Sequence, residues 1–252
     1  MTGVRDGPPR PSIRELPSPE PDVVLRLARL PGTVDEAAGR HRFRVLSDPE
    51  RRRAARFRRQ ADRDEYVLAH WLLRLTLSTG TSVPPQSWDF TQEQHGRPRI
   101  ARRFGDARQF SLSHAAGTCL VAVSTGRRVG VDIERRRTAD GPRALLRNSL
   151  SPDELTRLAA LPAEQRESEF IQLWTLKEAL AKAVGAGLRL PFADLDFSRR
   201  NGRPVLGRSA TVPAPELWTC HCLDAPADFR AALCVRTAHP TTAVPIRGVR
   251  ET

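Results

Sequence analysis

Lysine is almost absent from this 252-residue chain. Lys177 and Lys182 are the only two lysines, although lysine and arginine together number 41. Both lie in one stretch, QLWTLKEALAKAV (172–184). A general preference for arginine explains the other basic positions, but it does not explain why the chain uses lysine twice within one short segment.

Long hydrophobic runs are also absent. No stretch of 18 apolar residues occurs, which argues against a membrane-spanning helix. The first residues, MTGVRDGPPRPSIRELPSPEP, are polar and proline-rich and lack the apolar core of a secretory signal. We therefore predict a cytoplasmic protein with no membrane partner, and flexible tails at residues 1–20 and 239–252.

Cysteines are few. The four are Cys119, Cys220, Cys222 and Cys234. Without an export signal we expect reduced thiols. Cys220, His221 and Cys222 lie in an apolar, strand-like stretch, and no second pair of ligands follows at a familiar zinc spacing. This pattern favours buried thiols over a zinc site.

Acidic residues are too few to balance the basic ones, and the net charge is +12. Such a surface favours acidic partners: nucleic acid, anionic lipid, a phosphorylated small molecule or an acidic protein. The cluster RRRAARFRR (51–59) makes a basic, non-enzymatic nucleic-acid-binding protein the main alternative function. Against it, no finger, RNA-recognition or helix-turn-helix signature occurs, and we expect no nucleic-acid partner.

Two parts of the chain resemble each other. WDFTQEQHGRPRI (88–100) matches LDFSRRNGRPVL (195–206), and upstream LSDPE (46–50) matches LSPDE (150–154). Each upstream element is a capping box, in which a serine begins a helix and a glutamate three residues later reaches back to it. A unit of roughly 105 residues therefore occurs twice.

Both copies predict the same order of elements. A short strand, VVLRL (23–27) or VGVDIE (129–134), precedes the capping box; a helical region then runs to Gly80 or Gly185; about three antiparallel strands follow. This order predicts an α+β fold with two similar halves, residues 21–126 and 127–238, related by pseudo-twofold symmetry. We expect a monomer with its functional cleft between the halves.

Acidic residues distinguish the second half from the first. Asp132 and Glu134 lie two residues apart on a predicted strand and so share a face, while Val131 and Ile133 take the other. On the following helix, Trp174, Glu178 and Lys182 recur every four residues, while Leu173, Leu176 and Leu180 can supply the packing. The first-half helix places Arg74 at the position that corresponds to Glu178.

Three carboxylates suit a hard cation. Asp132, Glu134 and Glu178 could hold Mg²⁺, or Mn²⁺ in its place, and leave positions for water and a substrate phosphate. Lys182 would place a compact charge beside that phosphate, where a broad guanidinium would be too wide. The alternative is structural: the two strand acids end in solvent, and Glu178 and Lys182 form an ordinary ion pair along a helix.

The motifs, taken in order, resemble a known family. SLSH (111–114), GVDIE (130–134) and WTLKEALAKAVGAGL (174–188) are similar to motifs of the 4′-phosphopantetheinyl transferase superfamily. The duplication and the GRP element resemble its larger, monomeric, surfactin-synthetase-type branch. The resemblance covers about residues 46–236 and implies transfer of the phosphopantetheine arm of coenzyme A to a serine of an apo carrier protein. The carrier would be an acidic acyl or peptidyl carrier domain of a fatty-acid, polyketide or non-ribosomal peptide synthase, and the analogy favours the last two.

The resemblance also implies roles for individual residues. Asp132, Glu134 and Glu178 would hold the metal, Glu178 would act as the base, and Lys182 would neutralise the transferred phosphate. Residues expected to contact coenzyme A are Arg53, Arg97, Ser113, His114, Lys177 and Lys182. The family's usual arginine after Asp62 is not obvious in this chain, and Trp174 is expected to pack.

Overall fold

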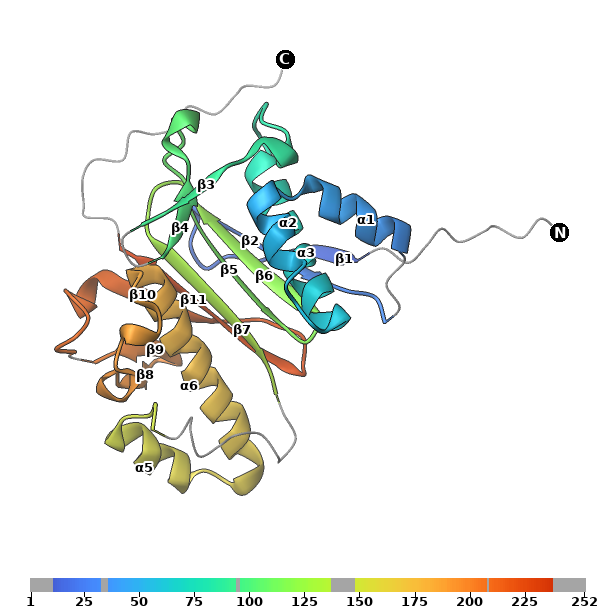
Figure 1. Ribbon diagram of the computed structural model, residues 1–252. Coiled ribbons are helices and arrows are strands. Elements are labelled where there is room, and N and C mark those ends of the chain that lie inside the picture. Colours follow the sequence, from blue (N-terminus) through green and yellow to red (C-terminus); the bar gives the residue numbers. More distant parts are fainter. Residues whose placement is uncertain (1–10, 33–35, 94–95, 137–147, 208, 238–252) are drawn as a thin grey trace, which may run out of the picture.

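Two antiparallel sheets form the centre of the molecule, and a long helix covers the outer side of each (Figure 1). The structure is a computed structural model and describes residues 11–32, 36–93, 96–136, 148–207 and 209–237. The first sheet has the strand order β1-β2-β6-β5, and the second has the order β10-β11-β7. Two small hairpins, β3-β4 and β8-β9, lie outside these sheets.

The order of elements repeats as the sequence predicts. The first half contains β1 (Ser12–Leu16), β2 (Val23–Arg29), α1 (Glu36–Val45), α2 (Asp48–Ala54), α3 (Gln60–Ser78), β3 (Phe90–Gln92), β4 (Pro98–Ile100), β5 (Gln109–Ala115) and β6 (Thr118–Ser124). The second contains β7 (Val129–Arg135), α5 (Pro152–Ala160), α6 (Ala163–Val184), β8 (Phe197–Arg200), β9 (Arg203–Leu206), β10 (Trp218–Leu223) and β11 (Phe229–Arg236). In each half, a strand precedes the main helices, a small hairpin follows, and a strand pair comes last. The α+β prediction is confirmed.

The helix boundaries follow the predicted signals. The backbone N–H of Ser47 donates to the Glu50 carboxylate over 2.7 Å, and that of Ser151 donates to Glu154 over 2.9 Å. These bonds satisfy donors that the first turn of a helix leaves unpaired. At the other end of α6, Gly185 takes a left-handed conformation with φ 85° and donates to the Ala181 carbonyl.

A core shared by both halves joins the two sheets. Apolar residues of the first sheet meet alternate residues of the second in one cluster of buried side chains. Its members include Leu25, Leu27, Leu120 and Ala122 from the first half and Val129, Val131, Ile133, Leu233 and Val235 from the second. Strand β5, at the edge of the first sheet, contacts β7, at the edge of the second. The two halves therefore pack as one body around β7.

Helix α6 lies directly against the other face of β7. A Cβ atom on Gly130 would come within 2.0 Å of the Ala179 carbonyl oxygen and 2.5 Å of the Ala183 nitrogen, so only glycine fits there. Since side chains alternate along a strand, Asp132 lies on the same face as Gly130 and meets the same helix. The packing of Leu173, Leu176 and Leu180 into the core of this half confirms their predicted role.

Two expectations about the chain ends and cysteines are wrong. Residues 12–16 were expected in a flexible tail, yet they form β1, which pairs antiparallel with β2 and covers the edge of the sheet. Cys220 and Cys234 were expected as reduced thiols, yet they form a disulfide, because they lie directly opposite each other on β10 and β11. Cys119 and Cys222 are free, as expected.

Residues 1–10 and 238–252, and with them the predicted boundary of the C-terminal tail at residue 239, lie outside the described residues. Among the helices that the structure describes, none combines the length and apolar character needed to cross a membrane.

Candidate functional site

Asp132 lies at the centre of a polar cluster where the two halves meet. Its side chain is buried, on β7, beside the edge strand β5 of the other half. Ser113 on β5 donates its hydroxyl to Asp132 Oδ1 over 2.7 Å, and Lys182 Nζ on α6 lies 2.6 Å from the same oxygen. Lys182 also donates to the Ser113 hydroxyl over 3.0 Å. Three predicted site residues, far apart in sequence, therefore form one closed network.

Glu178 completes this cluster. It lies one helical turn before Lys182 on α6, on the partly exposed face that the sequence predicts. Burial, followed by the negative charge of Asp132, raises its pKa, and Lys182 opposes the shift. The two carboxylates are therefore close enough to repel each other, which favours a cation or a shared proton between them.

One oxygen of Asp132 has no partner in the described structure. Oδ1 takes both hydrogen bonds, while Oδ2 is buried without a hydrogen bond. An unpaired buried carboxylate oxygen is costly. The arrangement of Oδ2 and Glu178 therefore fits the oxygen ligands that a hard divalent cation prefers.

Glu134, the third predicted metal ligand, lies on the same face of β7 but nearer its end, across from Arg230 of β11. In the described residues no group of three or more His, Cys, Asp or Glu side chains is placed to hold a metal ion. The structure thus brings two of the three predicted carboxylates together.

Ser113 and His114 point in different directions. Ser113 faces β7, whereas His114 Nδ1 lies 2.6 Å from Glu65 Oε1 of α3. Glu65 was not identified from the sequence, because a single acid on a helix carries no signal of a partner on a distant strand. Glu65 also lies in the stretch after Asp62 where the resemblance predicts an arginine.

Arg97 is buried beneath the end of α6. It donates to the Val129 carbonyl over 3.2 Å, and its Nη1 is buried without a hydrogen-bond partner in the described structure. Burial and the charge of nearby Arg128 lower the pKa of Arg97 to about 10. Arg128, which the sequence did not single out, bonds the Val184 carbonyl and Glu93. Arg53 lies apart from this group, exposed on the last turn of α2.

Lys177 does not lie at the site, and its predicted contact with coenzyme A is wrong in this structure. Its side chain is 0% exposed and bonds Glu154 and the carbonyls of Ser149 and Phe192. Burial lowers its pKa, and Glu154 opposes the shift. The lysine therefore ties α6 to the capping box of α5.

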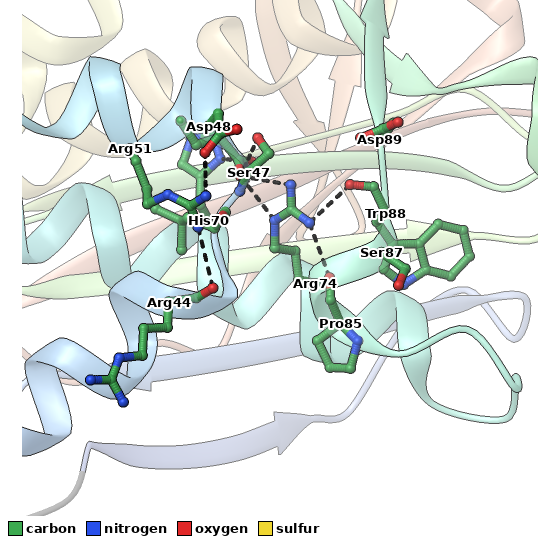
Figure 2. Close-up of polar contacts among 12 residues, drawn as sticks. Arg44, Ser47, Asp48, Arg51, His70, Arg74, Pro85, Ser87, Trp88 and Asp89 are labelled. Carbon is green, nitrogen blue, oxygen red and sulfur yellow. Dashed lines mark hydrogen bonds and ion pairs between the residues drawn. The ribbon is translucent and has the colours of Figure 1, made fainter.

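Arg74 is the counterpart of Lys177, not of Glu178 as the alignment of the two halves predicts. It is buried, it pairs with Glu50 of the first capping box, and it donates to the carbonyls of Pro85 and Trp88, as Figure 2 shows. His70 lies 2.8 Å from the second oxygen of Glu50. Each half thus holds one buried cation on its capping-box glutamate. Trp174 packs edge-on against Phe192, as expected.

Comparisons with known proteins agree with these motifs. Residues 128–234 match the family model described as the 4′-phosphopantetheinyl transferase superfamily. The chain is 32% identical over 179 residues to the 4′-phosphopantetheinyl transferase HetI of Nostoc sp., covering 69% of this chain and 75% of that one. It is 26% identical to a 4′-phosphopantetheinyl transferase of Bacillus subtilis, covering 78% and 84%. It is 27% identical to the transferase Sfp of Bacillus subtilis, covering 60% and 65%.

Proposed function

The chain belongs to the 4′-phosphopantetheinyl transferase superfamily, and we propose that it performs the family's transfer with Asp132, Glu178 and Lys182. The reaction moves the 4′-phosphopantetheine arm of coenzyme A to a serine of an apo carrier protein. The serine oxygen forms a bond to the phosphorus that carries the arm, the pyrophosphate P–O bond breaks, and adenosine 3′,5′-bisphosphate leaves. The observation that carries the assignment is the Asp132–Ser113–Lys182 network beside Glu178, built from both halves.

Glu178 is the proposed base for the incoming serine. Burial and Asp132 raise its pKa, which makes the carboxylate a stronger acceptor than an exposed glutamate. The serine proton would pass to Glu178, directly or through one water. Its position on the half-exposed face of α6 leaves room for a carrier serine to approach.

Asp132 Oδ2 and Glu178 would hold Mg²⁺, or Mn²⁺ in its place. The fit rests on the unpaired buried oxygen of Asp132 and its proximity to a second carboxylate. Glu134 remains a candidate third ligand, on the same face of β7 as Asp132. When bound, the ion would screen the charge of the pyrophosphate.

Lys182 would meet the transferred phosphate. Its ammonium lies beside Asp132 and is partly exposed, with a side-chain exposure of 30%. An ammonium directs its donors from one compact atom toward Asp132, Ser113 and a phosphate oxygen, whereas a guanidinium spreads its donors over a wider, fixed plane. This is the proposed reason why the chain, which otherwise uses arginine, has lysine at this position.

The nucleotide end of coenzyme A would lie at the first half. His114 is the proposed contact for the 3′-phosphate, with Arg97 and Arg53 as further basic contacts. The Ser113 hydroxyl donates its only proton to Asp132 and accepts a hydrogen bond from Lys182. We therefore propose that Ser113 orients Asp132 and Lys182, and that Lys182, not Ser113, contacts the phosphate.

An acidic carrier protein is the proposed partner, since the net charge of +12 attracts acidic surfaces. The rival interpretation, a nucleic-acid-binding protein, is not supported, because the relatives are transferases. We expect a monomer, since one chain supplies both sides of the Asp132 network.

Incubation of the purified protein with coenzyme A, Mg²⁺ and an apo carrier tests the proposal directly. The intact mass of the carrier should rise by about 340 Da, the mass of one phosphopantetheine group. Asp132→Ala and Glu178→Ala should abolish this shift while retaining the circular dichroism of the folded protein. Glu164→Ala removes an exposed carboxylate from the first turn of α6 and should leave the reaction intact. A near wild-type rate in either site variant would refute the assignment of that residue.

A further inference from the structure

Glu65 is a half-buried carboxylate that the proposed chemistry does not use. It lies on α3, and its side chain is 16% exposed. One oxygen, Oε1, lies 2.6 Å from His114 Nδ1, and the other, Oε2, accepts the backbone N–H of Gly117 over 2.8 Å. Burial alone would raise the pKa of Glu65, but the bonds from His114 and Gly117 lower it. Both oxygens of an ionised carboxylate are thus engaged by the β5–β6 hairpin.

The hairpin turn needs such support. Ala116 and Gly117 connect the paired residues Ala115 and Thr118, with positive φ angles of 47° and 74°. Two consecutive positive φ values match the twist of a tight hairpin, but the positive φ of Ala116 is unfavourable for a residue with a Cβ atom. The Gly117 carbonyl accepts the Leu30 N–H over 2.8 Å, while Glu65 accepts its N–H. The turn beside His114 is therefore fixed from two sides.

The bond to Glu65 also determines how the imidazole ring is presented. Nδ1 faces the carboxylate, so in the neutral ring the proton lies on Nδ1. Nε2, on the opposite edge of the ring, points away from Glu65. The His114 side chain is 34% exposed, so an external group can reach the ring.

We propose that Glu65 is a positioning residue, which holds His114 by Nδ1–H and so orients the ring with Nε2 toward a phosphate of the donor, to which Nε2–H donates when both ring nitrogens carry protons. This inference rests on the proposed function for the identity of the phosphate, that of coenzyme A. The bonds among Glu65, His114 and Gly117 do not depend on it.

Substitution by glutamine separates the two tasks of Glu65. A carboxylate offers an acceptor oxygen to each of the two donors, whereas an amide offers only one. Glu65→Gln should therefore lose one of the two bonds at almost unchanged size. Glu65→Asp keeps the charge but shortens the side chain, and serves as a second variant should the first be unstable. Asp62→Asn is the matched control, because Asp62 is exposed in the first turn of the same helix.

Nitrogen chemical shifts of ¹⁵N-histidine-labelled protein test the positioning without turnover. In the unaltered protein at high pH, the His114 signals should show the Nδ1–H form. In Glu65→Gln and Glu65→Asp they should move toward the Nε2–H form, which an unconstrained imidazole prefers, and in Asp62→Asn they should not change. Wild-type tautomer signals in both Glu65 variants would overturn the proposal.

Calorimetric binding of coenzyme A tests the consequence. Glu65→Gln should weaken binding by about tenfold, the usual effect of one lost charged hydrogen bond. It should change binding of 3′-dephospho-coenzyme A by less than about twofold, because the phosphate in question is missing. In a His114→Ala background, Glu65→Gln should have almost no further effect, since residues that act as a unit are not additive.

The possible failures are distinguishable. Tighter binding of coenzyme A by Glu65→Gln would mean that the carboxylate repels the phosphate. A full effect of Glu65→Gln in the His114→Ala background would mean that Glu65 acts only through the hairpin turn. Either result would overturn the positioning role of Glu65. No binding of coenzyme A by the unaltered protein would refute the proposed function itself. If Glu65→Gln bound coenzyme A as tightly as the unaltered protein, only the role of Glu65 would be refuted.

Discussion

At the scale of single residues, the two lysines have different tasks. Lys182 is partly exposed beside Asp132, whereas Lys177 is fully buried on Glu154. Sequence spacing places Lys182 on the face of Glu178 because both lie on one helix. The same spacing cannot show that Lys177 is buried, because the partners of Lys177, which are Glu154, Ser149 and Phe192, come from other elements.

The first prediction contrasts these two lysines. Lys182→Arg should lower the transfer rate about 10²–10³-fold without loss of thermal stability, since a guanidinium cannot replace the ammonium at a preorganised site. Lys177→Met should lower the free energy of unfolding by about 3–5 kcal/mol, because it leaves Glu154 buried without its cation. Rate assays and urea unfolding measure the two effects. A Lys182→Arg enzyme with a wild-type rate would mean that the choice of lysine there has no chemical reason.

The second prediction concerns Glu50 and pH. Burial would raise its pKa, but the bond and charge of His70, followed by Arg74 and Ser47, bring it down to about 2 from 4.5. A depressed pKa stabilises the folded state above pH 4.5, and the contribution is lost as pH falls toward 2. The shift corresponds to roughly 3 kcal/mol. Glu50→Gln should therefore be less stable than the unaltered protein at pH 7, and the gap should narrow below pH 4.5. A gap that stays constant from pH 7 to pH 3 would contradict this assignment.

At the scale of elements, the close contact between β7 and α6 sets the geometry of the site. Gly130 brings the strand and helix backbones together, and Asp132, Glu178 and Lys182 lie on the two facing surfaces. Alternation along β7 and the four-residue spacing on α6 predict which side chains share a face of each element. They do not predict the closeness of the two elements, for which the glycine itself is the signal.

The third prediction follows from this contact. Gly130→Ala should force α6 away from β7, because the added Cβ would lie 2.0 Å from the Ala179 carbonyl oxygen. We expect a stability loss of about 1–3 kcal/mol, as for other overpacked cores, and a larger loss of activity, because Lys182 and Glu178 move relative to Asp132. Gly32→Ala is the control, since nothing lies within 4 Å of its added Cβ. Normal activity in a folded Gly130→Ala protein would show that the site tolerates a displaced helix.

Elements that rely on partners distant in sequence are the ones that sequence reasoning missed. Both capping boxes and the end of α6 at Gly185 are local patterns, and the structure contains each of them. Strand β1 is short and follows a proline-rich stretch, so only its pairing with β2 reveals it. The Cys220–Cys234 disulfide requires the register of β10 against β11. The bond between Glu65 and His114 likewise joins a helix to a strand.

At the scale of the whole molecule, the two halves are chemically unequal but share a core. Each half holds a buried cation on its capping-box glutamate, and only the second carries the acids of the site. The central cluster takes residues from both sheets, so neither half buries its apolar strand face alone. Asp132 of the second half also depends on Ser113 of the first. The halves resemble a fused dimer whose interface contains the site.

The final prediction is that the two halves unfold together. Removing either half would expose the apolar faces of the central cluster, which couples their stabilities. Trp88 reports on the core beneath α3, and Trp174 reports on the packing of α6 against Phe192. Two variants would each keep one tryptophan, Trp88 or Trp174, with phenylalanine at the other tryptophan positions. In each variant, the denaturant midpoint measured by fluorescence should equal the midpoint measured by circular dichroism. If the two probes instead gave transitions separated in denaturant, the halves would be independent domains. The Asp132 network would then join two units that can fold apart, and activity would be lost at the first transition.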